Sequence, residues 1–246
     1  MTSILKIKNI HKHFGGIHAL NSCNMEIEKG KIIAIIGPNG SGKSTLFNVI
    51  SSLIPSDNSG TIHLEKEDIT NLQDYRVARA GISRTFQDVR LFKNLAIKDH
   101  LEIALSTQDE KLFTSLFKTP QDNQKRIKEI LDIVGLDKPL DTFAINLSYG
   151  QRKLLDLAVA LAKPHRILML DEPVAGVNPR LRSSIKQTLK KLNKKGETIL
   201  LIEHDMNFVM DLAHHIFVLD QGKVIASGKP KQIQNNKKVL EAYLGD

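Results

Sequence analysis

The feature that most constrains the fold is a glycine-rich run that follows a short, continuous apolar segment. Residues Ile32–Ile36 are all apolar, which is typical of a strand covered on both faces of a parallel sheet. Residues 37–45 then read G-P-N-G-S-G-K-S-T, and an apolar helical pattern follows over 46–53. This order of strand, glycine-rich loop and helix predicts an α/β fold whose loop binds phosphate.

Each part of residues 37–45, here called the phosphate loop, has a role in such a site. Backbone N–H groups between the glycines curl around a β-phosphate, and the helix N-terminus adds its dipole. Lys43 can reach the β- and γ-phosphates, and the Ser44 hydroxyl can ligate Mg²⁺. The predicted nucleotide site therefore consists of Gly37, Pro38, Asn39, Gly40, Ser41, Gly42, Lys43, Ser44 and Thr45.

Two further apolar segments end in polar residues at the same predicted edge of the sheet. Residues 167–170 are followed by Asp171 and Glu172, and residues 198–202 precede His204 by one position. Asp171 can hold Mg²⁺ as the second half of the site, and Glu172 can accept a proton from an attacking water or orient it. His204 is suited to contact a γ-phosphate, because ligands of open α/β sheets bind at this edge.

Other classes of protein with a phosphate loop fit less well. A GTPase needs N-K-x-D to read guanine, and the nearest string, N-K-K-G at 193–196, lacks the aspartate. A small-molecule kinase needs clustered arginines for its second substrate, and the sequence has no such cluster. Neither class accounts for the string L-S-Y-G-Q at residues 147–151.

The composition is that of an ordinary cytosolic globular protein. Of the 246 residues 41% are hydrophobic and 25% charged, and the longest apolar runs are far shorter than a membrane span. The N-terminus lacks the pattern of a signal peptide, and the single cysteine, Cys23, fits a reducing compartment as a small side chain near a strand. The net charge of +8 would suit nucleic acid, an anionic membrane surface, or a nucleotide-binding protein with a solvated lysine-rich face, and we favour the solvated face with anionic lipid nearby. Because aromatic residues are only 5% and are not interleaved with basic ones, we expect no nucleic-acid partner.

The string at 147–151, here called the signature, decides among the remaining classes. Ser148 is a good N-cap and Gly150 permits close backbone approach, while Leu154, Ala158 and Leu161 form an apolar helical stripe. The free N–H groups at such a helix start attract phosphate. With the phosphate loop, the signature resembles that of the nucleotide-binding subunits of ATP-binding cassette (ABC) transporters. In that family a similar string, L-S-G-G-Q, clamps the γ-phosphate bound to the opposite subunit.

The resemblance covers nearly the whole chain and implies a fold, an activity and a set of site residues. The implied fold is α/β, with a P-loop NTPase core, an antiparallel β layer and an inserted helical subdomain, and the implied activity is ATP hydrolysis with Mg²⁺. Gln87 matches the family's Q-loop glutamine, which senses Mg²⁺ or water. Phe14 stands where the family has an aromatic that stacks on adenine, although a buried aromatic is the alternative. The implied catalytic residues are Glu172, His204 and Gln87, the metal ligands Ser44, Gln87 and Asp171, and the signature contacts Ser148, Gly150 and Gln151.

Two departures from the family pattern point to one branch. Tyr149 replaces the third signature residue, and residues 175–178 read A-G-V-N where the family usually has S-A-L-D, so that Asn178 replaces a carboxylate. Both resemble ATPases of importers for branched-chain and other hydrophobic amino acids. So do the strings at 14–16, 85–92, 118–120, 203–206 and 241–245. Urea importers and lipopolysaccharide exporters share parts of this set, and a soluble cassette protein acting on ribosomes or DNA is a further alternative.

We expect a single ABC ATPase domain with a core over 1–88 and 158–246 and a helical subdomain over 89–157. The alternating residues 4–8 predict an edge strand, and residues 216–226 predict a hairpin. The expected partners are a second ABC subunit (identical or a sister chain), a separate two-chain membrane permease and, indirectly, an extracytoplasmic solute-binding protein. The expected location is the cytoplasmic face of the inner or plasma membrane, with the isolated chain soluble.

Overall fold

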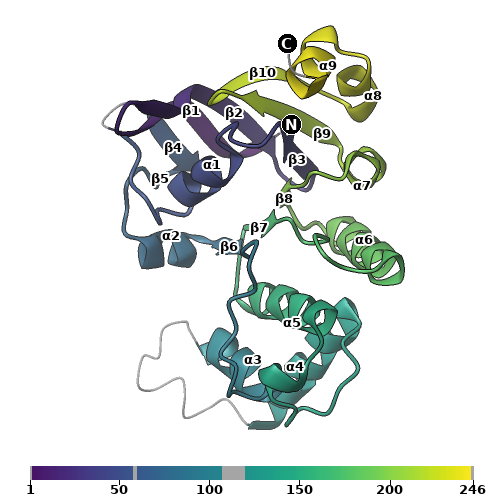
Figure 1. Ribbon diagram of the computed structural model, residues 1–246. Helices are drawn as coiled ribbons and strands as arrows, with labels where there is room; N and C mark the ends of the chain where they lie inside the picture. The colour runs from purple at the N-terminus through teal and green to yellow at the C-terminus, as the bar shows by residue number, and fades with distance from the viewer. Residues whose placement is uncertain (1, 58–59, 107–119, 245–246) are drawn as a thin grey trace. The chain divides into compact units, whose positions relative to one another are not determined.

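The computed structural model describes residues 2–57, 60–106 and 120–244 (Figure 1). The chain separates into two compact units. Unit 1 comprises residues 1–84, 166–172 and 190–246, and unit 2 comprises residues 85–165 and 173–189. Residues 118 and 119 of one branch string, and Gly245 of another, lie outside the described residues.

Unit 1 contains a six-stranded sheet, sheet B, in the order β10-β9-β3-β8-β7-β6. Its strands are parallel except for β10, which pairs with β9 as an antiparallel hairpin. Every residue of β3, β7 and β8 is buried, as the apolar runs in the sequence predict. The strand bounds are β3 Ile32–Ile36, β6 Ile82–Arg84, β7 Ile167–Asp171, β8 Ile199–Ile202, β9 His215–Asp220 and β10 Lys223–Gly228.

An antiparallel four-stranded sheet, sheet A, forms the second layer of unit 1, in the order β2-β1-β4-β5. The expectation of an edge strand at residues 4–8 is wrong, because this segment belongs to β1 and pairs with β2 on one side and β4 on the other. Its alternation reflects one buried and one solvated face of the sheet, which a central antiparallel strand also shows. The strand bounds are β1 Ser3–Phe14, β2 Ile17–Glu28, β4 Thr61–Leu64 and β5 Glu67–Asp68.

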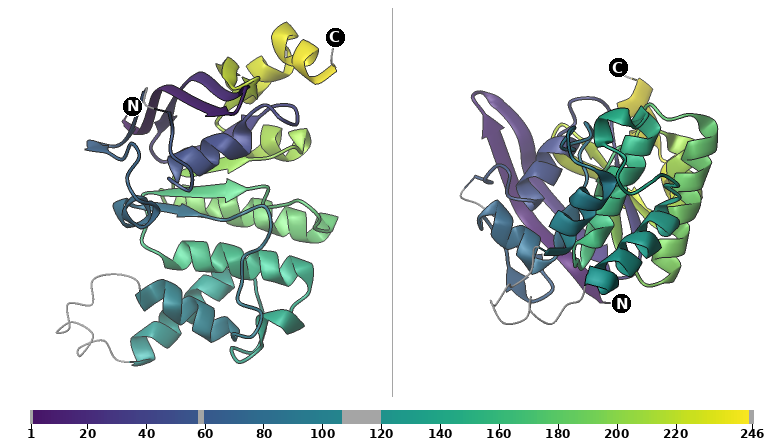
Figure 2. Two further views of the ribbon diagram at one scale, coloured as in Figure 1. Left: turned by 60° about the vertical axis from the view of Figure 1, so that its left-hand side comes forward. Right: turned by 90° about the horizontal axis from the view of Figure 1, so that it is seen from below.

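Helix α1 (Lys43–Ile50) follows the phosphate loop and packs in the core between the two sheets (Figure 2). The helix ends at Ile50, so the predicted continuation to Leu53 is wrong, and Leu53 is 41% exposed. Ser52 has a backbone φ of 54°, in the left-handed region that ends a helix. The other helices of unit 1 are α2 Asp74–Ala80, α7 Met206–Leu212, α8 Pro230–Gln234 and α9 Lys237–Leu244.

Cys23 lies in β2 and is completely buried in the core of unit 1. Burial raises the pKa of its thiol to about 12. A thiol with this pKa is not a nucleophile at neutral pH, which agrees with the expected structural role.

Unit 2 is helical and packs α3, α4 and α5 against one another (Figure 2). Helix α6 begins in unit 2 and ends in unit 1. The helix bounds are α3 Ile97–Ser106, α4 Pro120–Val134, α5 Tyr149–Ala162 and α6 Pro179–Lys194, with a short 3-10 helix at Ala144–Asn146. The predicted stripe of Leu154, Ala158 and Leu161 is buried. The structure therefore contains a helical part as well as an α/β part, as expected.

Candidate functional site

The phosphate loop connects the C-terminal end of β3 to α1, and Lys43 lies inside its curve. The Lys43 Nζ atom donates to the carbonyl oxygens of Gly37 at 2.9 Å and Pro38 at 2.7 Å, and to Ser41 Oγ at 3.3 Å. Burial lowers the pKa of Lys43, and the charges of Glu172 and Asp171 oppose that shift. The loop thus holds one nearly buried cation, 6% exposed, near two carboxylates of the same unit.

Two glycines of the loop are required by close backbone approach. A Cβ built on Gly37 would lie 2.0 Å from the Leu219 carbonyl oxygen, and one on Gly42 would lie 2.3 Å from that of Ala19. Both glycines have a positive φ, at 153° and 101°, and the second opens α1. Only glycine fits both positions, and the helix start after Gly42 presents free N–H groups to an anion.

Asp171 ends β7 and is held by a buried arginine that the sequence analysis missed. Arg84 Nη2 lies 3.0 Å from Asp171 Oδ2, and the two side chains are 6% and 5% exposed. The other nitrogen, Nη1, donates to Asn48 Oδ1 at 2.8 Å and Ser51 Oγ at 2.9 Å on α1 and just after it. The available signal was a lone arginine at the end of the short strand Ile82–Arg84, which runs beside β7.

Glu172 and His204 follow the neighbouring strands β7 and β8, and their side chains meet. His204 Nε2 lies 2.7 Å from Glu172 Oε1, with the carboxylate 13% and the imidazole 41% exposed. The Glu172 backbone has a φ of 48°, unusual for a residue other than glycine, and its N–H donates to the Ile202 carbonyl at 3.0 Å. Strained backbones of this kind gather at functional sites, where the surroundings hold a side chain in one direction.

Phe14 ends β1 and is 47% exposed, so the alternative of a buried aromatic does not hold. Lys12 Nζ lies 5.4 Å from the centroid of its ring. Ile17, which pairs with Phe14 across the turn, is also exposed. An exposed ring of this kind presents a flat face to a planar ligand.

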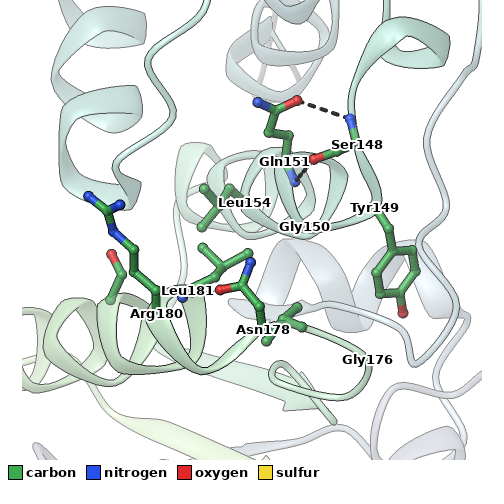
Figure 3. Close-up of a pocket in the computed structure, with 11 residues that line it drawn as sticks. Ser148, Tyr149, Gly150, Gln151, Leu154, Gly176, Asn178, Arg180 and Leu181 are labelled. Carbon is green, nitrogen blue, oxygen red and sulfur yellow. Dashed lines mark hydrogen bonds between the residues drawn. The ribbon is translucent and has the colours of Figure 1, made fainter.

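The signature starts α5 in unit 2, and its serine is the N-cap as predicted. Ser148 Oγ accepts the Gln151 N–H at 3.3 Å, and Gln151 Oε1 accepts the Ser148 N–H at 3.0 Å (Figure 3). This capping box was not predicted, although serine followed three positions later by glutamine is its usual sequence sign. The close neighbour of Gly150 is Leu181 of α6, since a Cβ there would lie 2.5 Å from Leu181 Cδ2.

Gln87 is exposed on a bend of unit 2, next to two buried charges of α5. Its carbonyl oxygen accepts from Lys153 Nζ at 2.9 Å. The neighbouring Phe86 N–H donates to the Asp156 carboxyl group. Burial raises the pKa of Asp156 to about 7, although the charges of Lys153 and Lys163 and the bond from Phe86 lower it. The main chain at Gln87 is therefore tied to the signature helix.

A cavity of about 560 Å³ lies beside the signature within unit 2 (Figure 3). It is lined by the signature on one side and by residues 176–184 on the other. Asn178 lies on its wall, and its side-chain oxygen accepts the Leu181 N–H at 2.9 Å at the start of α6. In the described structure this amide therefore acts as a helix cap.

The oxygen donors of unit 1 fit Mg²⁺. No group of three or more His, Cys, Asp or Glu in the described ranges could hold a metal ion. Ser44 and Asp171 offer hard oxygen ligands, and Mg²⁺ in nucleotide sites keeps several waters and takes further ligands from phosphates. Few protein ligands are thus expected.

The comparison with family models decides the classification. A model described as ABC transporter matches residues 20–175, which hold the phosphate loop, Gln87, the signature and Asp171-Glu172. The chain belongs to the ABC transporter family. A second model, described as Branched-chain amino acid ATP-binding cassette transporter, matches residues 223–246 at the C-terminal end of this cassette.

Full-length relatives and solved structures agree with this assignment. The cassette is 41% identical to a probable branched-chain amino acid transport ATP-binding protein LivG of Archaeoglobus fulgidus, over 98% of this chain and 95% of that protein. It is 38% identical to the high-affinity branched-chain amino acid transport ATP-binding protein LivG of Escherichia coli K12, over 99% and 98%.

Two solved ABC cassettes match the fold. One, in the ADP conformation, superposes with a TM-score of 0.86 at 35% identity over the whole of both chains. The other, a dimeric bacterial cassette, has a TM-score of 0.82 at 28% identity over 92% of this chain and 98% of that one. The predicted α/β fold with an antiparallel layer and a helical part is confirmed.

Proposed function

We propose that this cassette is the ATP-hydrolysing subunit of an ABC importer for branched-chain or related hydrophobic amino acids. The observation that carries the proposal is full-length similarity to branched-chain amino acid transport ATP-binding proteins, together with the C-terminal match at 223–246. That match favours the amino-acid branch over the urea, lipopolysaccharide and non-transport alternatives.

The chemistry follows from the unit 1 geometry. Backbone N–H groups of the phosphate loop and the Lys43 ammonium would neutralise the phosphates of ATP. Glu172 would take the proton of the attacking water, and His204, 2.7 Å from its carboxylate, would hold that carboxylate in place and contact the γ-phosphate. Phe14 would stack on adenine.

Mg²⁺ would be held by Ser44 and Asp171, with Gln87 as a further ligand or water contact. The ion would neutralise charge on the β- and γ-phosphates. The Arg84 ion pair fixes the direction of the Asp171 carboxylate in advance. The chain's own contribution is thus an oriented, nearly buried carboxylate.

The signature would act on the nucleotide of a second ABC subunit. Its residues Ser148, Gly150 and Gln151 form a helix start in unit 2, whereas the phosphate loop of the same chain belongs to unit 1. The division into a core over 1–88 and 158–246 and a subdomain over 89–157 belongs to the same proposal.

No helix in the described ranges is long and apolar enough to span a membrane. We place the cassette at the cytoplasmic face, on a separate two-chain permease fed by a solute-binding protein.

Uptake measurements test the proposal. Cells that lack the gene should lose energised uptake of radiolabelled leucine, isoleucine or valine, while the solute-binding protein keeps its affinity. The wild-type gene should restore uptake, whereas Lys43→Ala should not, because this variant loses the cation at the phosphates and with it ATP hydrolysis. The matched control is Lys29→Ala, which removes an exposed lysine that forms an ion pair with Glu65.

Two results would contradict the proposal at different levels. Normal amino-acid uptake with a defect in urea uptake or lipopolysaccharide export would keep the transporter and overturn the branch. Normal transport of all these solutes with a defect in translation or DNA repair would overturn both.

A further inference from the structure

Two residues that depart from the family motifs lie next to each other in unit 2. Tyr149 replaces a signature glycine, and Gly176 lies in residues 175–178, here called the post-Glu172 segment. A Cβ built on Gly176 would lie 3.1 Å from Tyr149 Cε1 and 3.7 Å from Cζ, and Gly176 has a φ of 71°. Figure 3 shows Tyr149 at the start of α5 with its ring turned away from the Ser148–Gln151 bonds. The ring therefore occupies the space that another side chain at position 176 would need.

The same ring lies near a buried cation that reaches the Q-loop. Lys153 Nζ is 5.9 Å from the Tyr149 ring centroid, within the range of a cation–π contact. Lys153 is only 5% exposed, whereas Tyr149 is 41% exposed, so the contact is shielded from water on the lysine side. The same Nζ donates to the Gln87 carbonyl at 2.9 Å. Tyr149 thus contacts the post-Glu172 segment directly and the Q-loop through Lys153.

We infer that Tyr149 is a positioning residue: with Lys153 it holds residues 85–88 and the post-Glu172 segment to the start of the signature helix. Three motif segments that are far apart in the sequence then move as one part of unit 2. Glycine at position 149 offers neither a face for Lys153 nor a cover for Gly176. The inference rests on the proposed roles of Gln87 and the signature, but the contacts themselves can be tested without them.

A nearby carboxylate makes the buried lysine tolerable. Asp156, one helical turn beyond Lys153, is 8% exposed and accepts the Phe86 N–H. Two successive residues, Phe86 and Gln87, are therefore bonded to α5, one by the Asp156 carboxyl group and the other by the Lys153 ammonium. Buried polar groups keep their place only when they are hydrogen-bonded, so these two bonds, with the Tyr149 contacts here called the bridge, have one preferred geometry.

Amide hydrogen exchange of the purified full chain tests the contacts directly. Tyr149→Ala should raise exchange about tenfold in peptides covering 85–88 and 174–178, because both segments lose their support. Tyr149→Phe keeps the ring and should leave both peptides unchanged. The control is Tyr75→Ala, which removes another exposed ring that lies near cations, in this case the arginines Arg76 and Arg79 of unit 1.

Lys153→Met tests the contact with Gln87 separately from the contact of Tyr149 with Gly176. This variant should raise exchange in 85–88 but not in 174–178, since only the contact with Gln87 passes through the lysine. Unchanged exchange in both peptides of Tyr149→Ala would overturn the inference, as would a rise spread evenly over all of α5. Equal behaviour of Tyr149→Phe and Tyr149→Ala would overturn it as well.

ATPase kinetics supply a second readout. Tyr149→Ala should lower kcat several-fold while nucleotide affinity of the single subunit stays the same, because the phosphate loop lies in unit 1. If the exchange results hold and kcat does not change, the bridge has no part in positioning for catalysis and the inference fails. If no variant and no wild-type chain hydrolyses ATP, the proposed function fails instead, whatever the exchange shows.

Discussion

At the scale of single residues, the two carboxylates of the proposed ATP site, Asp171 and Glu172, are oriented by a strained backbone in one case and a buried ion pair in the other. Glu172 has a left-handed backbone with a φ of 48° and a side chain 2.7 Å from His204. Asp171, its neighbour, is 4% exposed and paired with Arg84. Such arrangements persist only where the surrounding structure imposes them, so each residue has a specific variant that should expose its role.

Glu172→Gln separates binding from chemistry. The amide should keep Mg-ATP binding and slow hydrolysis by roughly 10²–10⁴-fold, because it cannot take the proton of the attacking water. The ATP-bound dimer should then accumulate, which size-exclusion chromatography with ATP measures. Glu67→Gln, at an exposed carboxylate of β5, should behave like the wild type. Normal hydrolysis by Glu172→Gln, or loss of ATP binding, would exclude Glu172 as the base.

Arg84→Met should lower the free energy of unfolding by about 3–5 kcal/mol, because it removes the buried guanidinium that pairs with the buried Asp171 carboxylate. Arg166→Met is the matched control: its guanidinium is 45% exposed and lies 3.6 Å from Glu65 and 3.8 Å from Glu67. An exposed pair of this kind contributes about 0–1 kcal/mol. Urea unfolding measures the free energy of unfolding of both variants. Equal decreases in the two would mean that the Arg84 pair stabilises unit 1 no more than an exposed pair does.

At the scale of elements, α5 combines a capped start, an apolar stripe and two buried charges. The capping box satisfies N–H groups at its first turn, the apolar stripe is buried, and the helix packs on α3 and α4. Lys153 and Asp156 use the same helix to bind the main chain at residues 86–87. The helix therefore supports both the signature and the Q-loop.

Asp156 should make the stability of the protein depend on pH. Its pKa rises from 3.8 to about 7 on folding, mainly through burial. In this window the folded state keeps a proton that the unfolded state has lost, so stability should fall as pH rises from about 4 to about 7. Asp156→Asn should remove this part of the fall, as urea midpoints at about pH 5 and pH 8 would show. Asp132→Asn, at an exposed carboxylate of α4, should keep the parent's pH dependence; the same dependence in Asp156→Asn would refute the prediction.

At the scale of the whole molecule, the residues of the proposed ATP site fall into two sets. Unit 1 holds the phosphate loop, Asp171, Glu172, His204 and Phe14, and unit 2 holds Gln87 and the signature. A site divided in this way suits an enzyme in which one subunit binds ATP and a second subunit completes the site.

Ser148→Arg should block ATP-dependent dimerisation while the single subunit binds ATP with nearly unchanged affinity. The reason is that the new cation replaces the cap of the signature helix, whereas the proposed nucleotide contacts of the same chain lie in unit 1. Light scattering with ATP measures the dimer, and titration with a fluorescent nucleotide measures binding. Ser106→Arg, at the end of α3, is the control. Loss of ATP binding by Ser148→Arg would mean that the signature acts on the nucleotide of its own chain.

Local patterns in the sequence were sufficient for the fold class, the phosphate loop and the cap at Ser148. Apolar runs, glycine spacing and a serine before a helical stripe act over a few neighbouring residues, so the chain itself carries the information. The buried strands β3, β7 and β8 confirm the predicted α/β class, and the capping box confirms the predicted N-cap. Only the tertiary structure decided what depends on partners distant in sequence. In the structure β1 lies inside sheet A and Phe14 is exposed. Arg84 pairs with Asp171, 87 positions away in the sequence, and the Tyr149 ring lies beside Gly176. Such pairings are chosen by the packing of the whole core, which no local period encodes.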